Sequence, residues 1–211
     1  MRLYFLVIAS LFGALLVNAA PAKPEPDAGK VADNAFKSDF FEFRYIFPQG
    51  WSTVNDEVRM QDNRKRHNAS VKKAGAEAPR DTPQRTTTVQ VFWIYDLLVA
   101  TPAPLAADAK PALPHVHIWA MERFGLFSKA GDNAKQMAGL PTAKVLQASH
   151  EETIAGHSFV RTDLVHHNDN FEALFETESG KYLLFFEFRG RNAQEINELA
   201  KTMESLKFET K

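Results

Sequence analysis

Two histidines with strand spacing are the clearest candidates for chemistry in this sequence. His115 and His117 alternate with Val116, Ile118 and Ala120, so both imidazoles would project from one face of a strand, about 6 to 7 Å apart. Such a pair can share a zinc or copper ion if further ligands come close in space. The residues considered for that role are His150, Asp163, His166, His167 and Asp169. A pair that only faces solvent or a covering helix is the alternative interpretation.

The familiar catalytic motifs do not occur in the sequence. Ser158 lies two residues after Gly156, as in a nucleophile elbow, but the glycine that this motif needs two residues after the serine is Val160 here. Phosphate-cradling, dinucleotide-binding, zinc-protease and calcium-loop motifs are absent, and no cofactor is predicted. The absence of cysteine excludes a disulfide scaffold, a thiolate metal site and a cysteine nucleophile. The clustered acids are interpreted as a solvated face rather than as glycosidase carboxylates; they are Glu151, Glu152, Glu172, Glu176 and Glu178.

The net charge of −1 conceals two segments of opposite charge. Residues 59–85 contain eight basic and three acidic side chains, whereas residues 150–211 contain seven basic and twelve acidic ones. A basic surface segment can dock an acidic protein or an anionic component of the cell envelope. The predicted contact residues are Arg64, Lys65, Arg66, Lys72 and Lys73. A merely solvated helix is the alternative, and nucleic acid is not expected because the segment lacks interleaved aromatic residues.

The N-terminus has the pattern of an export signal. A positive start at Arg2 precedes an uncharged run from Leu3 to Val17, and small residues lead to Ala19, after which we expect cleavage. The run is shorter than the ~20 apolar residues of a membrane-spanning helix, so no span is expected in the mature chain; an uncleaved anchor is the alternative. Residues 20–37 are expected to form a flexible, proline-rich leader. An exported chain without cysteine is typical of a bacterial periplasmic or extracellular protein.

The remaining residues predict an antiparallel sheet with a few helices. Period-two alternation predicts strands at 39–47, 86–95, 115–121, 158–166, 171–177 and 181–189, with a further extended segment at 143–154. Helices are expected at 52–78, at 132–140 and after the capping residue Asn192. Residues 101–114 form a proline-rich loop. About 170 residues therefore remain for one domain, over 38–211.

Four short motifs mark turns and strand starts along this stretch. They are Pro48-x-Gly50-Trp51, Ile154-Ala155-Gly156-x-x-Phe159, Gly180-x-Tyr182-Leu183-Leu184-Phe185 and Ser205-Leu206-x-Phe208. Their order resembles the PsbP-like superfamily over roughly residues 40–208. The resemblance implies an α+β fold, an α/β/α sandwich in which an antiparallel sheet of about six strands is covered by helices. It transfers no catalytic residue.

The function expected from these observations is that of an exported, non-enzymatic binding or assembly module with an unknown partner. Two alternatives remain open. The first is a periplasmic metal-binding protein that uses His115 and His117. The second is an enzyme with a cleft that no motif reveals.

Overall fold

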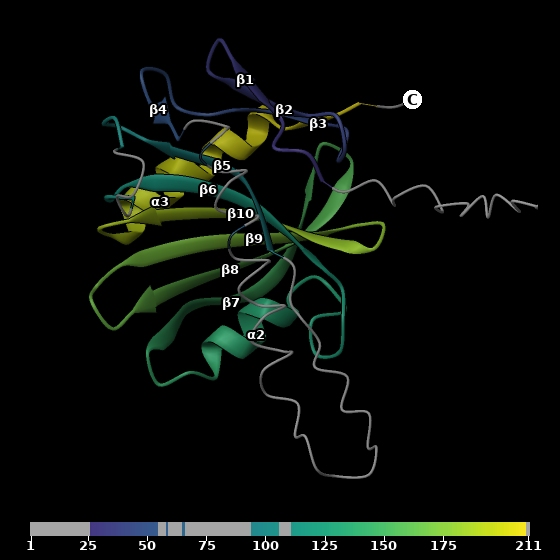
Figure 1. Ribbon diagram of the computed structural model, residues 1–211. Coiled ribbons are helices and arrows are strands. Elements are labelled where there is room, and N and C mark those ends of the chain that lie inside the picture. The colour runs from purple at the N-terminus through teal and green to yellow at the C-terminus, as the bar shows by residue number, and fades with distance from the viewer. Residues whose placement is uncertain (1–25, 55–57, 59–64, 66–93, 106–110, 210–211) are drawn as a thin grey trace, which may run out of the picture.

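The computed structural model describes residues 26–54, 58, 65, 94–105 and 111–209. In this part of the chain, two antiparallel sheets carry the fold (Figure 1). The large sheet has the order β4-β5-β6-β10-β9-β8-β7, and the small sheet has the order β1-β2-β3-β11. The predicted α+β class with an antiparallel sheet is confirmed. The large sheet has seven strands rather than about six, and the separate small sheet was not predicted.

The bounds of the elements follow the predicted strands closely after residue 115. The strands are β1 Lys30–Ala32, β2 Ala35–Ser38, β3 Phe43–Ile46, β4 Ser52–Thr53, β5 Ile94–Thr101, β6 His115–Glu122, β7 Ala143–Ile154, β8 His157–His166, β9 Phe171–Ser179, β10 Tyr182–Gly190 and β11 Lys207–Phe208. The helices are α2 Asp132–Ala138, α3 Ala193–Ala200 and the 3-10 helix η1 Lys201–Ser205. Asn192 caps α3 as predicted, since its Oδ1 accepts a hydrogen bond from the Glu195 amide.

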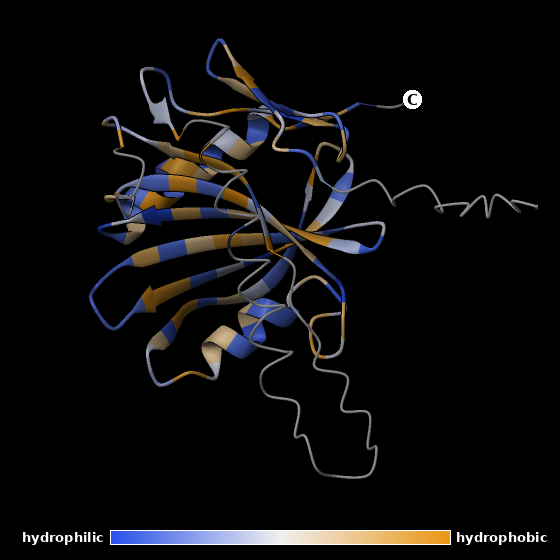
Figure 2. Ribbon diagram, viewed as in Figure 1, coloured by the Kyte–Doolittle hydropathy of each residue, from blue (hydrophilic) through white to orange (hydrophobic). Residues whose placement is uncertain are grey.

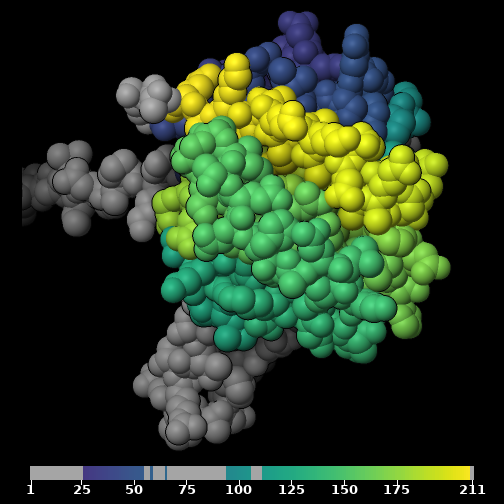
Figure 3. Space-filling model, turned by 180° about the vertical axis from the view of Figure 1, so that it is seen from behind, coloured from purple at the N-terminus to yellow at the C-terminus, as the bar shows by residue number. Residues whose placement is uncertain are grey.

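One face of the large sheet packs against the small sheet, α3 and η1. Figure 3 shows α3 and η1 between the N-terminal strands and the green strands of the large sheet. The shared core is aromatic: Phe43 and Tyr45 of β3 contact Phe186 of β10, with ring centroids 5.5 and 6.1 Å apart. The polar residues that alternate with apolar ones along β9 (Figure 2) therefore lie on the face of the sheet opposite this core.

Among the described residues, α2 and the loop that precedes it cover part of the opposite face. Ala134 of α2 belongs to a second buried apolar cluster with four residues of the sheet, Met121, Leu174, Leu183 and Phe185. Met121, Leu183 and Phe185 lie toward one end of β6 and β10, and Leu174 lies near the middle of β9, opposite Glu187. The other end of the same strands carries polar side chains instead, and it holds the predicted histidines.

The predicted leader is wrong for its last residues, which belong to the fold. β1 and β2 occupy residues 30–38 and pair as a hairpin. The connecting residues Asp33 and Asn34 both have positive φ, 49° and 58°, which is the conformation that two-residue hairpin turns require. Phe36 is fully buried against Phe43. The Asp-Asn pair is the turn signal that the interpretation as a leader overlooked.

The predicted helix over 52–78 begins later than expected, since Ser52 and Thr53 form β4 beside β5. Val58 and Lys65 are helical, and the rest of that segment lies outside the described residues. Most of the predicted strand at 86–95 also lies outside the described residues. Its last two residues begin β5, which continues to Thr101. The signal peptide also lies outside the described residues. No helix in the described ranges is long and apolar enough to cross a membrane.

Candidate functional site

The two histidines project from the partly open face of the sheet, as their spacing predicts. Val116 and Ile118 of β6 are fully buried in the aromatic core, whereas His115 and His117 point the other way. Trp119 continues this row, and its indole stacks on Phe185 of β10 at 3.7 Å with an interplanar angle of 8°. The alternation of β6 therefore places two imidazoles and an indole side by side.

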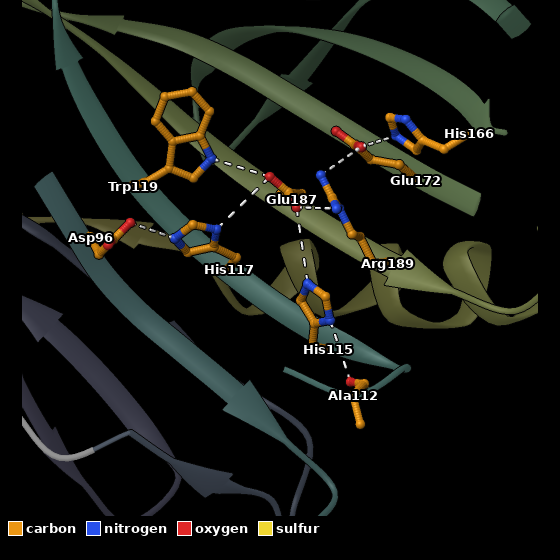
Figure 4. A network of polar contacts seen from close by, with 9 residues as sticks. All are labelled: Asp96, Ala112, His115, His117, Trp119, His166, Glu172, Glu187 and Arg189. Atoms are coloured by element: carbon orange, nitrogen blue, oxygen red, sulfur yellow. Dashed lines mark hydrogen bonds and ion pairs between the residues drawn. The ribbon is translucent and has the colours of Figure 1, made fainter. Parts of the chain in front are cut away.

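A row of alternating acidic and basic side chains, which includes His117, crosses the neighbouring strands β5, β6, β10, β9 and β8 (Figure 4). We call it the polar ladder; it consists of Asp96, His117, Glu187, Arg189, Glu172 and His166. His117 faces carboxylates with both ring nitrogens, since Nε2 lies 2.8 Å from Asp96 Oδ1 and Nδ1 lies 3.9 Å from Glu187 Oε2. Glu187 also accepts a hydrogen bond of 3.3 Å from Trp119 Nε1.

The far half of the ladder is built around Arg189. Its Nε lies 2.5 Å from Glu187 Oε1, as a charge contact without hydrogen-bond geometry, and one terminal nitrogen lies 3.2 Å from Glu172 Oε2. Burial alone would lower the pKa of Arg189, but the carboxylates of Glu187 and Glu172 raise it above the ordinary value. Glu172 is 2% exposed and also contacts His166 Nε2 at 2.5 Å. The guanidinium thus stays charged between two buried carboxylates.

Strand register and one bulge bring the ladder together. Antiparallel pairing sets His117 opposite Glu187, and Arg189 opposite Glu172. On β5, Leu97 is an extra residue between the pairs formed by Asp96 and Leu98. The bulge allows Leu97 and Leu98 both to be buried while Asp96 stays on the ladder face.

His115 lies beside the ladder in a buried position. Its Nε2 is 4.0 Å from Glu187 Oε1, and its Nδ1 is 3.4 Å from the carbonyl of Ala112. Burial lowers the pKa of His115 to about 4, which outweighs the raising effect of Glu187. His115 is therefore neutral at pH 7.

An open groove of about 660 Å³ runs above the ladder, and we call it the ladder groove. Its polar lining includes ladder residues, His115 and two side-chain amides from the β8–β9 turn, Asn168 and Asn170. Its apolar lining comes from β5, from β6 and from the segment before β6: Ile94, Val99, Pro111, Leu113 and Trp119. A groove of this size, with mixed apolar walls and a few fixed polar groups, has the character of a small-ligand site.

The predicted metal ligands do not come together in the part of the chain that the structure describes. His115 and His117 approach the same carboxylate, Glu187, but no group of three His, Asp or Glu side chains there is arranged to hold a metal ion. His166 joins the ladder through Glu172, while His167 is exposed. Two further candidates are engaged elsewhere: His150 lies 3.0 Å from Glu152, and Asp163 pairs with Arg161 at 2.9 Å. The guanidinium of Arg189 on Glu187 also opposes a cation there.

The sequence interpretation overlooked most of the site. Asp96, Glu187 and Arg189 received no role, and the acids of β9 were expected to be solvated. Glu172 and Glu176 are in fact buried, 2% and 0% exposed, so that expectation is wrong for these two residues. The available signal was a charged pair, Glu187 and Arg189, continuing one face of a strand that is otherwise almost entirely apolar.

The predicted partner-binding residues lie almost entirely outside the described part of the chain. Lys65 is described and is exposed on a helical segment. Arg64, Arg66, Lys72 and Lys73 lie outside the described residues, so the basic contact surface stays a prediction.

Comparison with known proteins gives a similarity in fold. In sequence, the chain matches no family model and no curated protein. In structure, it is similar to the solution structure of cyanobacterial PsbP (CyanoP) from Synechocystis sp. PCC 6803, with a TM-score of 0.44 and 8% identity. The match covers 86% of this chain and 96% of that chain.

Proposed function

We propose that this protein is an exported, non-enzymatic binding module that holds its ligand in the ladder groove. The observation that carries the proposal is the polar ladder, with its three buried carboxylates Asp96, Glu172 and Glu187, beneath an open groove. Buried ion pairs contribute little net stability compared with an apolar core, because removing charges from water is costly. Three buried carboxylates on one face, with their partly buried partners, are therefore better explained by a binding role than by stability.

The contacts within the groove favour binding over catalysis. Nε2 of His117 is hydrogen-bonded to Asp96 at 2.8 Å and Nδ1 faces Glu187 at 3.9 Å, so both ring nitrogens are directed at carboxylates of the protein. Glu187 is engaged by Trp119, Arg189 and the two histidines. Among the described residues that line the groove, none is a serine, threonine, lysine or tyrosine that could serve as a nucleophile.

A second depression on the opposite face provides an internal comparison. It has a volume of about 570 Å³ and lies between the β7–β8 hairpin and the α3–η1 segment. Its cation Arg161 is held by Asp163 and Asn197, at 2.9 and 2.5 Å, much as Arg189 is held in the ladder groove. Its lining offers no aromatic surface comparable with the indole of Trp119, because its one aromatic residue, Phe175, is 1% exposed. We therefore place the ligand in the ladder groove.

Chemical-shift mapping with a library of small polar compounds tests this placement on the full chain. We expect compounds that bind to shift the backbone amides of His117, Trp119 and Asn170. The amides of Arg161 and Asn197 should not move, and they serve as the internal control. Shifts confined to Arg161 and Asn197, or no binding by any compound, would contradict the proposal.

The basic segment is proposed as a separate docking surface for an acidic protein or an anionic envelope component. The support for it is the excess of positive charge between residues 59 and 85. Pull-down from a periplasmic extract should lose its partners when charges are reversed at Arg64, Lys65, Arg66, Lys72 and Lys73. An unchanged set of partners would remove the proposal.

A further inference from the structure

The chemistry of the ligand follows from which polar groups of the ladder groove are still free to bond. The ladder carboxylates are occupied by their neighbours: Asp96 by His117, Glu187 by Trp119 and Arg189, and Glu172 by Arg189 and His166. In the described part of the chain, Nη1 of Arg189 makes no hydrogen bond, while Nε faces Glu187 and Nη2 faces Glu172. The side-chain amides of Asn168 and Asn170 likewise have no hydrogen-bond partner there.

The charges of the ladder select against charged ligands. A ligand carboxylate placed on Arg189 would lie close to Glu187 and Glu172, which already neutralise that guanidinium. A metal ion or an ammonium group placed on Glu187 would face the same guanidinium. An uncharged ligand is repelled neither by the carboxylates nor by the guanidinium, because the ladder alternates in sign and its charges are paired with one another.

The free groups lie on one side of the groove, and apolar surface lies on the other. Arg189, Asn168 and Asn170 lie at the β10 and β8–β9 side, where they offer planar donors and two amide acceptors. Val99 from β5 and the indole of Trp119 supply apolar surface toward the β5 side. The indole is fixed by its stack on Phe185 and its hydrogen bond to Glu187, so no ordering cost is added on binding.

We propose that the ladder groove binds an uncharged saccharide, and this proposal rests on the proposed function. Its hydroxyl groups bond to Arg189 Nη1, Asn168 and Asn170, and its C–H face packs on Val99 and Trp119. Hydroxyl groups both donate and accept, so they can satisfy the guanidinium donor and both ends of an amide. The groove volume of about 660 Å³ lies within the usual range for small-ligand sites, about 300–1,000 Å³.

Isothermal titration of the full chain with three neutral trisaccharides tests the proposal: maltotriose, cellotriose and tri-N-acetylchitotriose. We expect at least one to bind. The double variant Asn168→Ala with Asn170→Ala should weaken that binding about tenfold, the effect of losing two hydrogen bonds of about 0.7 kcal/mol each. The matched control is His167→Ala, in the same turn but outside the groove lining, which should leave affinity within about twofold.

The outcomes separate the ligand class from the site. If no trisaccharide binds while sodium propionate shifts the groove amides in the mapping experiment, the saccharide proposal is wrong and the groove remains a ligand site. If neither class of compound shifts the groove amides, the proposed function fails as well. Trisaccharide binding that the double asparagine variant leaves unchanged would also overturn the saccharide proposal. Thermal unfolding of each variant verifies that it is folded.

Discussion

The two halves of the partly open sheet face bury carboxylates in different ways. In the half covered by α2, Glu176 is fully buried, and its oxygens accept hydrogen bonds from the backbone amides of Gly131 and Ala134, at 2.9 and 2.8 Å. In the ladder half, Glu187 and Glu172 are held by side chains from neighbouring strands. Backbone donors at the start of α2 fix that segment on the sheet, while no described segment is bonded to the ladder in this way.

The effect of a buried carboxylate on the surface above it depends on whether backbone amides or side chains bond to it. Backbone amides close one half of the face, because the amides that bond to the carboxylate of Glu176 belong to the segment that covers it. Side-chain partners leave a groove, because each ladder residue pairs with another side chain of the same sheet and not with a segment that lies over the sheet. The covered half is therefore expected to determine stability, and the ladder half to determine binding.

The largest effect is expected in the covered half, at Phe185. The variant Phe185→Ala removes a fully buried ring that packs with Leu174 and Leu183 and supports the indole of Trp119. We expect the free energy of unfolding to fall by about 3–5 kcal/mol in urea titration. The control Val145→Ala, on a strand position that is 38% exposed, should cost no more than about 0.5 kcal/mol. A loss at Phe185 below about 1 kcal/mol would show that this half is not a packed core.

A smaller but substantial loss is expected in the ladder half, from Glu187→Gln. The change removes one of two carboxylates that compensate the partly buried guanidinium of Arg189. We expect a loss of about 2–3 kcal/mol in the same titration, because Glu172 remains as the only carboxylate described beside this charge. Glu178→Gln is the matched control, since Glu178 is 42% exposed in its pair with Arg123 and should cost at most about 1 kcal/mol. Equal effects of the two variants would mean that the ladder is solvated.

The two halves should respond to pH with opposite sign. Burial raises the pKa of Glu176 to about 7, despite the backbone amides that favour its charged form. The folded state then holds a proton that the unfolded state releases, so the covered half loses stability as pH rises from 4.5 to 7. Burial lowers the pKa of His115 to about 4, so the ladder half loses stability as pH falls from 6.5 to 4.

These opposed contributions are each about 2 kcal/mol between pH 7.5 and 5, so they nearly cancel in the parent protein. Glu176→Gln should remove the gain toward acid and leave a protein that is less stable at pH 5 than at pH 7.5. His115→Gln should do the reverse. Urea titrations at the two pH values measure both differences. If the two variants changed the pH dependence in the same direction, the assignment of opposite signs would be wrong.

Sequence periodicity was sufficient for most of the fold after residue 115. Alternation placed Val116 and Ile118 in the core and His115 and His117 on the opposite face, because side-chain direction in a strand has a fixed period. The hairpin of β1 and β2 was missed, since a short Asp-Asn turn next to a proline-rich segment gives a weak local signal.

The site was harder to predict than the fold. His117 reaches Asp96, which lies 21 residues earlier, and Glu187, which lies 70 residues later. Those contacts depend on strand order and on the bulge at Leu97, neither of which local spacing encodes. The histidine pair was found because its two members are close in sequence, and its actual partners were overlooked because they are not.

The smallest effect is expected at the end of the ladder, from His166→Gln. His166 contacts Glu172 through Nε2 at 2.5 Å and is the last member of the ladder, so its loss leaves Glu172 still paired with Arg189. We expect a decrease of about 1 kcal/mol in the free energy of unfolding, the value of one hydrogen bond. His167→Gln is the neighbouring control, because that side chain is exposed and outside the ladder. A loss as large as that of Glu187→Gln would mean that the ladder acts as one cooperative unit, in which the end residue supports Glu187 through Arg189.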